Sequence, residues 1–330
     1  MAVTANTNET YDVSTIREDL SEAMASITPT ETLLMSSIGT RNVDNTYFEW
    51  SEVDLAATGA NRQIEGDVGL SNTAPTNAVR KGGYTQISAK VVEVSSTNQA
   101  VNGVANAQTV AKQVAYKLSE LKRDMEAMLL SNVAANAGAS GTARATAGLP
   151  AYLTSNVSRG GSGANGTTSG TGEAGFVNAA ATDGTLRPIT EALLKGVIAD
   201  CWNAGATPKI VMCGSAQKQK ISTFTGNATR YKEAEDSKLN AAIDVYISDF
   251  GEVQIVPNRH MRVRTVSSVD YTPDVLVIDP SYAEVAYLQT AKQEPLAKTG
   301  LSERRLISCE YGLQVTSQKA HGIVADINAS

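Results

Sequence analysis

The segment NAQTVAKQVAYKLSELKRDMEAMLLSNVAA, at positions 106–135, carries the longest uninterrupted structural pattern in the chain. It contains neither glycine nor proline, the two residues that most strongly break helices. Its apolar residues recur at every third or fourth position and would form one stripe along a helix: Val110, Val114, Leu118, Leu121, Met125, Leu129 and Val133. Such a helix would be about 45 Å long, well beyond the ordinary helix of about three turns. We therefore expect a spine helix around which the rest of the chain is organised.

The chain before this helix has the composition of an arm that leads into a pair of strands. Residues 1–45 begin polar. Short helices are expected at Ser14–Ile27 and from Pro29 onward, since proline and an acidic residue suit a first helical turn. Asn45–Trp50 is typical of a strand, and Tyr84–Thr97 is its best candidate partner.

Residues 51–83, between those two strands, contain several glycines and few apolar residues. A structureless loop of that length is uncommon inside a compact domain. Two interpretations avoid this difficulty: the segment is disordered, or it is a long hairpin that gains order by lying on another subunit. The strands at its base favour the hairpin, which would make assembly obligatory.

The chain after the helix divides into a glycine-rich segment, an alternating region and a closing strand. Asn156–Gly175 is rich in Gly, Ser and Thr and is typical of a flexible or glycine-tethered surface loop. Residues 186–290 alternate helices with apolar strands such as Val275–Ile278, which indicates a subdomain around a small sheet. The closing strand, Leu306–Ile323, could pair with Tyr84–Thr97 and pack on the spine helix, so that 186–290 would be an insertion.

Composition excludes several classes of function. The net charge is −6, from 28 basic and 34 acidic residues, and this balance argues against sequence-independent nucleic-acid binding. One local basic run favours a solvated or subunit-contact face: Arg259, His260, Arg262 and Arg264. No cysteine lies in a CxxC pair, which argues against a disulfide framework and fits a reducing compartment. We expect no signal peptide and no membrane span.

Chemical motifs are incomplete throughout the chain. Gly161–Gly166 matches GxGxxG, but it lacks the preceding strand and the following helix that a dinucleotide site needs. Gly214-Ser215 lies between an expected strand and helix without a GxxxxGK[ST] motif, so a helix N-cap is the better interpretation. His260 and His321 have no HExxH spacing, and no GxSxG elbow is present. We predict no catalytic residue, no cofactor, no metal site and no enzyme activity.

The order of these parts resembles that of tailed-bacteriophage major capsid proteins of the Hong Kong 97 fold, in particular the branch with a Pro-Thr-Glu-Thr arm motif. The resembling residues up to the helix are Pro29–Thr32, Phe48–Trp50, Glu65–Asp67, Tyr84–Ile87 and Glu120–Glu126. Those after it are Gly148–Pro150, Val256–Arg259, Asp279-Pro280, Leu296–Gly300 and Glu310–Leu313. The match covers nearly the whole chain in order. The Asn156–Gly175 loop looks like a variable insertion, and nothing is carried over to it.

The resemblance implies an α+β chain of four parts. These are an N-terminal arm (1–45), an extended β-hairpin loop (46–98), a peripheral subdomain (99–185 and 291–330) that holds the spine helix at about 106–135, and an axial subdomain (186–290). On this view Val114, Leu118, Leu121 and Met125 hold the central sheet, while the charges of Lys117–Glu126 are free to meet neighbouring subunits.

The implied function is that of a major capsid protein that self-assembles into hexamers and pentamers and closes an icosahedral shell around packaged phage DNA. The extended loop would lie across a neighbouring subunit. Candidate interface residues are Trp50, Arg62, Glu65, Asp67, Lys122 and Arg123. Implied partners are other copies of the chain and portal, scaffolding and decoration proteins. Double-stranded DNA would be enclosed without sequence-specific binding, and no membrane would be involved.

The implied location is the virion capsid, assembled in the host cytoplasm. The alternative is another virion structural role, as a head-decoration or tail-tube protein, which would also be β-rich and oligomeric. A remote alternative from another class is a hydrolase that uses the Gly214-Ser215 turn.

Overall fold

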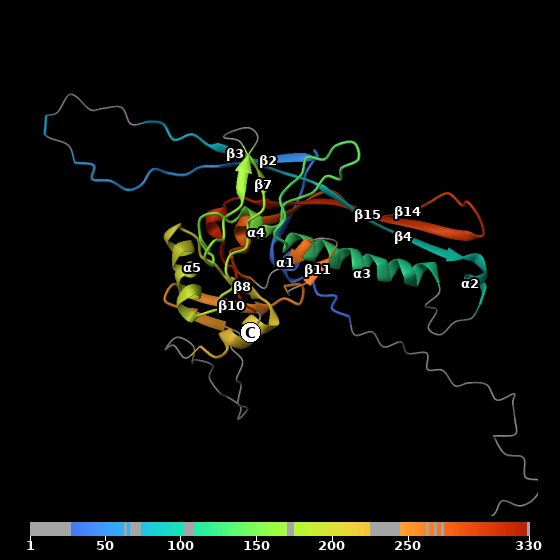
Figure 1. Ribbon diagram of the computed structural model, residues 1–330. Coiled ribbons are helices and arrows are strands. Elements are labelled where there is room, and N and C mark those ends of the chain that lie inside the picture. The colour runs from blue at the N-terminus through green and yellow to red at the C-terminus, as the bar shows by residue number, and fades with distance from the viewer. Residues whose placement is uncertain are drawn as a thin grey trace, which may run out of the picture.

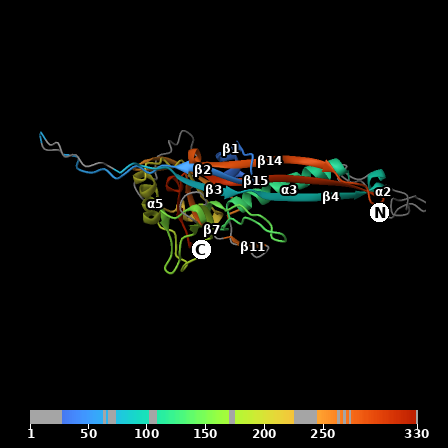
Figure 2. The same ribbon diagram turned by 90° about the horizontal axis from the view of Figure 1, so that it is seen from above.

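The chain forms an elongated molecule with a loop that reaches away from its body (Figure 1). A long layer of sheet and helix extends to one side, and a rounded lobe of helices and short strands lies at the other (Figures 1 and 2). The computed structural model describes residues 28–62, 65–66, 74–101, 109–169, 175–224, 245–261, 264–266, 269–271 and 274–328. The predicted helix at Ser14–Ile27 lies outside these residues.

A four-stranded sheet forms the long layer, in the order β1 (Gly39–Asn42), β14 (Ala283–Pro295), β15 (Ser302–Val315) and β4 (Gln86–Ser95). β1 is parallel to β14, and the other neighbours are antiparallel. β15 pairs with β4 along the whole length of β4. The predicted pairing of the closing strand with the Tyr84–Thr97 segment is therefore confirmed.

The spine helix is α3 (Val110–Leu129), and it lies along one face of this sheet against β4 and β15 (Figures 1 and 2). Thr109 is its N-cap, because the Thr109 hydroxyl accepts a hydrogen bond from the Lys112 amide at 3.4 Å. The predicted apolar stripe faces the sheet. Its buried members are Leu121, Met125 and Leu129, and Val110, Val114 and Leu118 pack half-buried against the same core.

The helix ends at Leu129, before the predicted end at residue 135. Backbone groups past that point bond to other segments instead of continuing the helical ladder. The Val133 carbonyl accepts from the Gly148 amide at 3.0 Å, and the Ala135 amide donates to the Val177 carbonyl at 2.9 Å. Gly148 comes so close that a Cβ there would lie 1.8 Å from the Ser131 carbonyl oxygen. Tertiary pairing thus overrides a sequence that favours helix.

The lobe is built on a six-stranded sheet. Its order is β5 (Val157–Ser158), β16 (Gly322–Val324), β13 (Val275–Ile278), β8 (Ile210–Cys213), β10 (Gly251–Pro257) and β9 (Val245–Ser248). The helices α5 (Glu191–Asn203) and α6 (Ser215–Ile221) pack on it and share its core. β5 and β16 come from outside 186–290, while β14 starts inside that range and joins the other sheet, so the two sheets do not divide the chain at the expected limits.

The sequence suggested that Asn45–Trp50 pairs with Tyr84–Thr97, but strand pairing joins the two segments only at Tyr84, which lies opposite Tyr47. The first segment forms β2 (Tyr47–Glu52), whose antiparallel partner is β3 (Val79–Tyr84). Thr85 separates β3 from β4: it is fully buried, its amide donates to the Thr46 carbonyl at 2.9 Å, and its hydroxyl bonds Glu310 at 2.7 Å. The chain therefore turns at Thr85 from the hairpin into the long sheet, and one predicted strand becomes two.

The described part of the glycine-rich segment, residues 156–169 and 175, is more ordered than a flexible loop. Within it, β5 pairs with β16, and β6 (Thr167–Ser169) pairs with β7 (Phe176–Ala179). The Asp326 carboxylate accepts the amides of Gly160 and Gly184 at 2.8 and 2.7 Å. A Cβ on Gly160 would lie 2.0 Å from the Thr185 carbonyl oxygen, so close backbone packing accounts for glycine there.

The short elements that remain connect these layers. They are α1 (Leu33–Ser37), α2 (Ser96–Ala100), α4 (Leu149–Tyr152), β11 (Arg264–Val266), β12 (Val269–Tyr271), and the 3-10 turns η4 (Pro280–Tyr282) and η5 (Gln318–Ala320).

Candidate assembly surfaces

The root of the extended loop is an aromatic cluster. Phe48 and Trp50 project from β2 and are 4% and 8% exposed. Their rings stack at 6.0 Å between centroids, and the Tyr152 ring lies 6.5 Å from that of Trp50. Trp50 was a candidate interface residue, but its burial within one chain makes it part of the root. The sequence could not distinguish an exposed from a buried tryptophan on a strand whose partner was misassigned.

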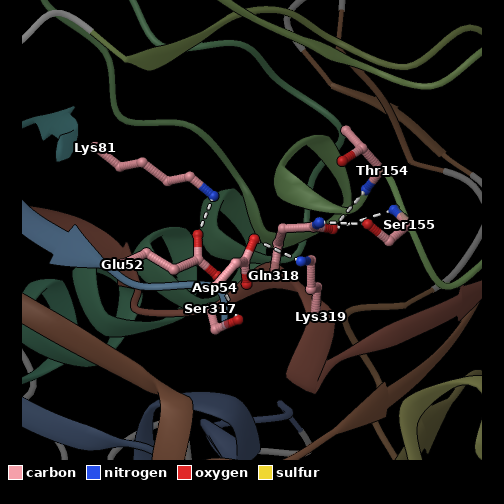
Figure 3. Close-up of polar contacts among 8 residues, drawn as sticks. All are labelled: Glu52, Asp54, Lys81, Thr154, Ser155, Ser317, Gln318 and Lys319. Atoms are coloured by element: carbon pink, nitrogen blue, oxygen red, sulfur yellow. Dashed lines mark hydrogen bonds and ion pairs between the residues drawn. The ribbon is translucent and has the colours of Figure 1, made fainter. Parts of the chain in front are cut away.

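Polar contacts tie the same root to the body (Figure 3). Glu52 forms an ion pair with Lys81 across the hairpin and accepts a hydrogen bond from the Ser317 hydroxyl at 2.6 Å. Two residues on, Asp54 pairs with Lys319 at 2.6 Å. Because Ser317 and Lys319 follow β15, the direction in which the loop leaves is fixed by the long sheet.

Gln318 anchors that same turn from the other side (Figure 3). Its side-chain oxygen accepts the amides of Thr154 and Ser155, both at 3.1 Å, and its amide group donates to the Ser155 hydroxyl. A groove of about 290 Å³ lies beside the root, between residues 51–54, the turn after α5 and residues 316–320. The root is thus held by several independent contacts.

Beyond Asp54, the described residues of the loop up to residue 78, which we call the limb, are all exposed. Residues 55–62 and 74–78 carry no helix or strand and are exposed, and they extend far from the body (Figures 1 and 2). Leu55 is 84% exposed and Val53 55%. The candidates Arg62 and Glu65 lie on this limb and are exposed, whereas Asp67 lies outside the described residues.

The charges of the spine helix are mostly engaged within the chain. Lys90 of β4 lies 2.7 Å from Asp124 and 3.5 Å from Glu120, and Lys117 lies 2.9 Å from Glu120. The hydrogen bond to Asp124 raises the pKa of Lys90, and the bond from Lys117 lowers the pKa of Glu120. The expectation that all these charges are free to meet neighbours is therefore wrong.

Three charged residues of α3 complete that picture. Glu126 is fully buried, and Arg123 is half-buried with its Nε enclosed. Lys122 is exposed, and no ion pair within the described residues involves it. Of the two helix candidates, Lys122 is therefore accessible at the surface, and Arg123 is accessible only in part.

The face of the long sheet opposite α3 is partly apolar and uncovered. Lys90 points toward α3, so the alternate residues Ile87 and Val91 point away from it. They are 61% and 47% exposed. At the far end of the sheet, Leu301 in the β14–β15 turn is 85% exposed. Exposed apolar groups at both ends of an elongated chain are typical of a subunit that associates.

Three side chains that could take part in catalysis are buried: His321, Cys201 and Cys213. Burial lowers the pKa of His321 to about 4, so its ring is neutral at pH 7. Burial raises the pKa of Cys201 and of Cys213 to about 12, which keeps both as inert thiols. Across the described residues, no group of three His, Cys, Asp or Glu side chains is placed to hold a metal ion. No helix in that same part of the chain has the length and apolarity needed to cross a membrane.

Comparison with known proteins agrees with this architecture. The model of the SU10 major capsid protein family matches residues 3–328. The major capsid protein of Escherichia phage Phieco32 is 24% identical over 351 residues, which cover 95% of each chain. A chain from Microbacterium phage Oxtober96 has a TM-score of 0.60 at 11% identity over 95% of this chain and 96% of that one. The capsid of a native GTA particle gives a TM-score of 0.59 at 14% identity, with 96% of both chains covered.

The solved structures define the class: the chain has the Hong Kong 97-like fold of phage capsid proteins. The chain belongs to the SU10 major capsid protein family, whose model matches almost its whole length. It is a phage major capsid protein, and the resemblance drawn from the sequence is confirmed. A structural capsid family implies a role that is not enzymatic.

Proposed function

We propose that this chain forms hexamers and pentamers that close an icosahedral shell around packaged double-stranded DNA in the virion. Family membership and fold support this proposal. The observation that carries it is the contrast along the extended loop, whose root is fixed by buried rings and ion pairs while its limb exposes Leu55 at 84%. A limb whose described residues are exposed is suited to lie on a neighbouring copy.

The contact residues follow from exposure. Arg62 and Glu65 on the limb would meet the neighbouring subunit, together with Lys122 and, in part, Arg123 of the spine helix. Asp67 lies outside the described residues and stays in this set on the family resemblance alone. Leu55 and Val53 would supply the apolar part of the contact. The burial of Trp50 removes it from this set.

The rest of the shell assignment rests on the family. In the assembled shell, each part of the chain would have the position that its name indicates in the family. These parts are the arm at 1–45, the loop at 46–98, the peripheral subdomain at 99–185 with 291–330, and the axial subdomain at 186–290. Portal, scaffolding and decoration proteins would be partners, and assembly would occur in the host cytoplasm. A net charge of −6 suits a shell that encloses DNA without gripping it.

Removal of the limb tests the proposal. In the test variant a short Gly-Ser linker replaces residues 55–78, and a control changes Leu186→Ser, an exposed apolar residue elsewhere, 61% exposed. We expect the deletion variant to keep its unfolding temperature but to form no shells or capsomer rings by electron microscopy, whereas the control assembles.

Normal shells from the deletion variant would overturn the role of the limb. Loss of folding would show that the limb belongs to the subunit's own core. If the unaltered chain formed only stacked rings of one symmetry, a tail-tube role would replace the shell.

A further inference from the structure

The carboxylate of Glu126 is fully buried at a junction of three parts of the chain. Its Oε1 accepts a hydrogen bond from the Leu34 amide at 2.7 Å and another from the Asn258 side-chain nitrogen at 2.8 Å. Its Oε2 accepts from the Met35 amide at 3.0 Å. Glu126 itself lies on the spine helix, so one side chain joins the arm, the spine and the lobe.

On the arm side, Glu126 supplies hydrogen-bond acceptors that the residues next to α1 do not supply. The first amides of any helix lack acceptors within that helix. In α1 the N-cap residue Thr32 makes no side-chain cap bond, and Glu126 supplies the acceptor for Leu34 and Met35 instead. Leu34 and Ile38 are 1% and 6% exposed in the same core as α3, so the arm is held by both burial and hydrogen bonds.

On the lobe side, Asn258 follows β10 and is 2% exposed. Its amide donates to the Cys213 carbonyl and its side-chain oxygen accepts from the His260 amide, both at 2.8 Å. The His260 ring lies 3.2 Å from the Glu31 carbonyl oxygen, which adds a second contact with the arm. We call Glu126, Asn258 and His260 the arm seat.

The seat brings together three segments that are distant in sequence. They are the arm around Pro29–Thr32, the end of the Glu120–Glu126 run and the turn at Val256–Arg259, and each carries part of the family resemblance. A buried carboxylate with three donors needs all of them, because losing one leaves charge without a partner. The donors on either side therefore stabilise one another through it.

We infer that Glu126 is a positioning residue that couples the docking of the arm to the conformation of the lobe turn 257–261. A neighbouring molecule that draws the arm off its seat would loosen that turn, and one that grips the turn would tighten the arm. Such coupling is reciprocal by thermodynamic necessity. It is a property of the single chain and does not depend on where the extended loop lies.

Hydrogen exchange on the full chain tests the coupling from both ends. Leu34→Ala loosens the arm, and Asn258→Ala loosens the turn. We expect Leu34→Ala to speed exchange at the distant His260 amide, and Asn258→Ala to speed it at the Leu34 and Met35 amides, each by about 10-fold. With Glu126→Leu in place, both cross-effects should shrink to about 2-fold, since the His260 ring still contacts the Glu31 carbonyl but the hydrogen bonds through Glu126 are gone.

Two further variants serve as a substitute and a control for this comparison. Glu126→Gln keeps one acceptor oxygen and can replace Glu126→Leu if that variant unfolds; it should release the Met35 amide more than the Leu34 amide. Glu120→Gln, a change on the same helix at a half-buried residue that pairs with Lys90 and Lys117 and lies outside the arm seat, should leave all these amides unchanged. Cross-effects that stay undiminished without Glu126 would overturn the inference, because the signal would then travel through apolar packing. Effects that stay confined to the mutated side would overturn it as well.

Discussion

The lobe and the extended loop of this capsid protein differ in how far they bury their residues within one chain. In the lobe, every residue of β13 is buried, at 1% exposure or less, between strands of its own sheet. On the limb of the loop, residues 55–62 are all exposed and none lies in a strand. Among the described residues, the lobe buries a core within one chain, and the limb does not. The difference predicts that mutations will separate into those that unfold the subunit and those that block its assembly.

The largest effect on stability should come at the root of the loop, where the buried body meets the exposed limb. Trp50→Ala removes a buried ring that packs on Phe48 and Tyr152, and we expect it to lower the free energy of unfolding by about 3–5 kcal/mol. Leu55→Ala, five residues along, should change it by less than about 0.5 kcal/mol. Denaturant titration of both variants measures the contrast. Equal small effects would return Trp50 to the set of contact residues.

Acidification should lower the free energy of unfolding through the body of the subunit before it affects the limb. Burial holds the pKa of His321 at about 4, below its ordinary value of 6.5, because desolvation disfavours the charged ring. The unfolded state therefore binds more protons between those values, so stability is full above pH 6.5 and falls as pH drops toward 4. The loss attributable to this group is about 3 kcal/mol.

The matching measurement is the free energy of unfolding between pH 7 and 4. His321→Gln should flatten the part of the curve that belongs to this residue, at the expense of some stability at pH 7. A slope unchanged by the substitution would assign the acid sensitivity to carboxylates instead.

The sequence predicted the features that depend on periodicity and chain order. The spacing of Leu121, Met125 and Leu129 gave the correct buried stripe, and the closing strand does pair with the segment that begins at Tyr84. Periodicity could not show where the helix stops, because Val133 and Ala135 bond to segments far along the chain. It could not show the turn at Thr85 either, since a buried threonine between two strands has no distinctive local pattern.

The arm seat was missed for a similar reason. The sequence pattern placed Glu126 with the solvent-facing charges of the spine helix. The residues that follow it, Ala127, Leu129 and Leu130, are apolar and buried, and they point to more than one side of the helix. That widening of the apolar face toward the helix end was the available signal that the last turn is enclosed. Its three donors come from residues 34, 35 and 258, which no pattern in the sequence connects.

A smaller effect is expected on the limb, and only in assembly. Leu55→Ala removes an apolar contact that would form between copies, so the protein concentration needed for shell formation should rise by about 10-fold. Light scattering against concentration measures this. Val245→Ala provides a control at another exposed apolar residue, 50% exposed, on the edge of the lobe sheet. An unchanged threshold for Leu55→Ala would restrict the contact to the polar residues of the limb.

The smallest effect should follow reversal of one charge on the spine helix. Lys122 is exposed without an ion-pair partner among the described residues, so Lys122→Glu should change the free energy of unfolding by less than about 0.5 kcal/mol. If Lys122 meets a neighbour, the same change should slow assembly at low salt and lose that effect as ionic strength rises, because salt screens exposed charges. Lys117→Glu is the comparison, since it breaks the pair with Glu120 inside the chain and should act mainly on stability. A salt-independent defect in Lys122→Glu would argue for a packing role and against an electrostatic contact.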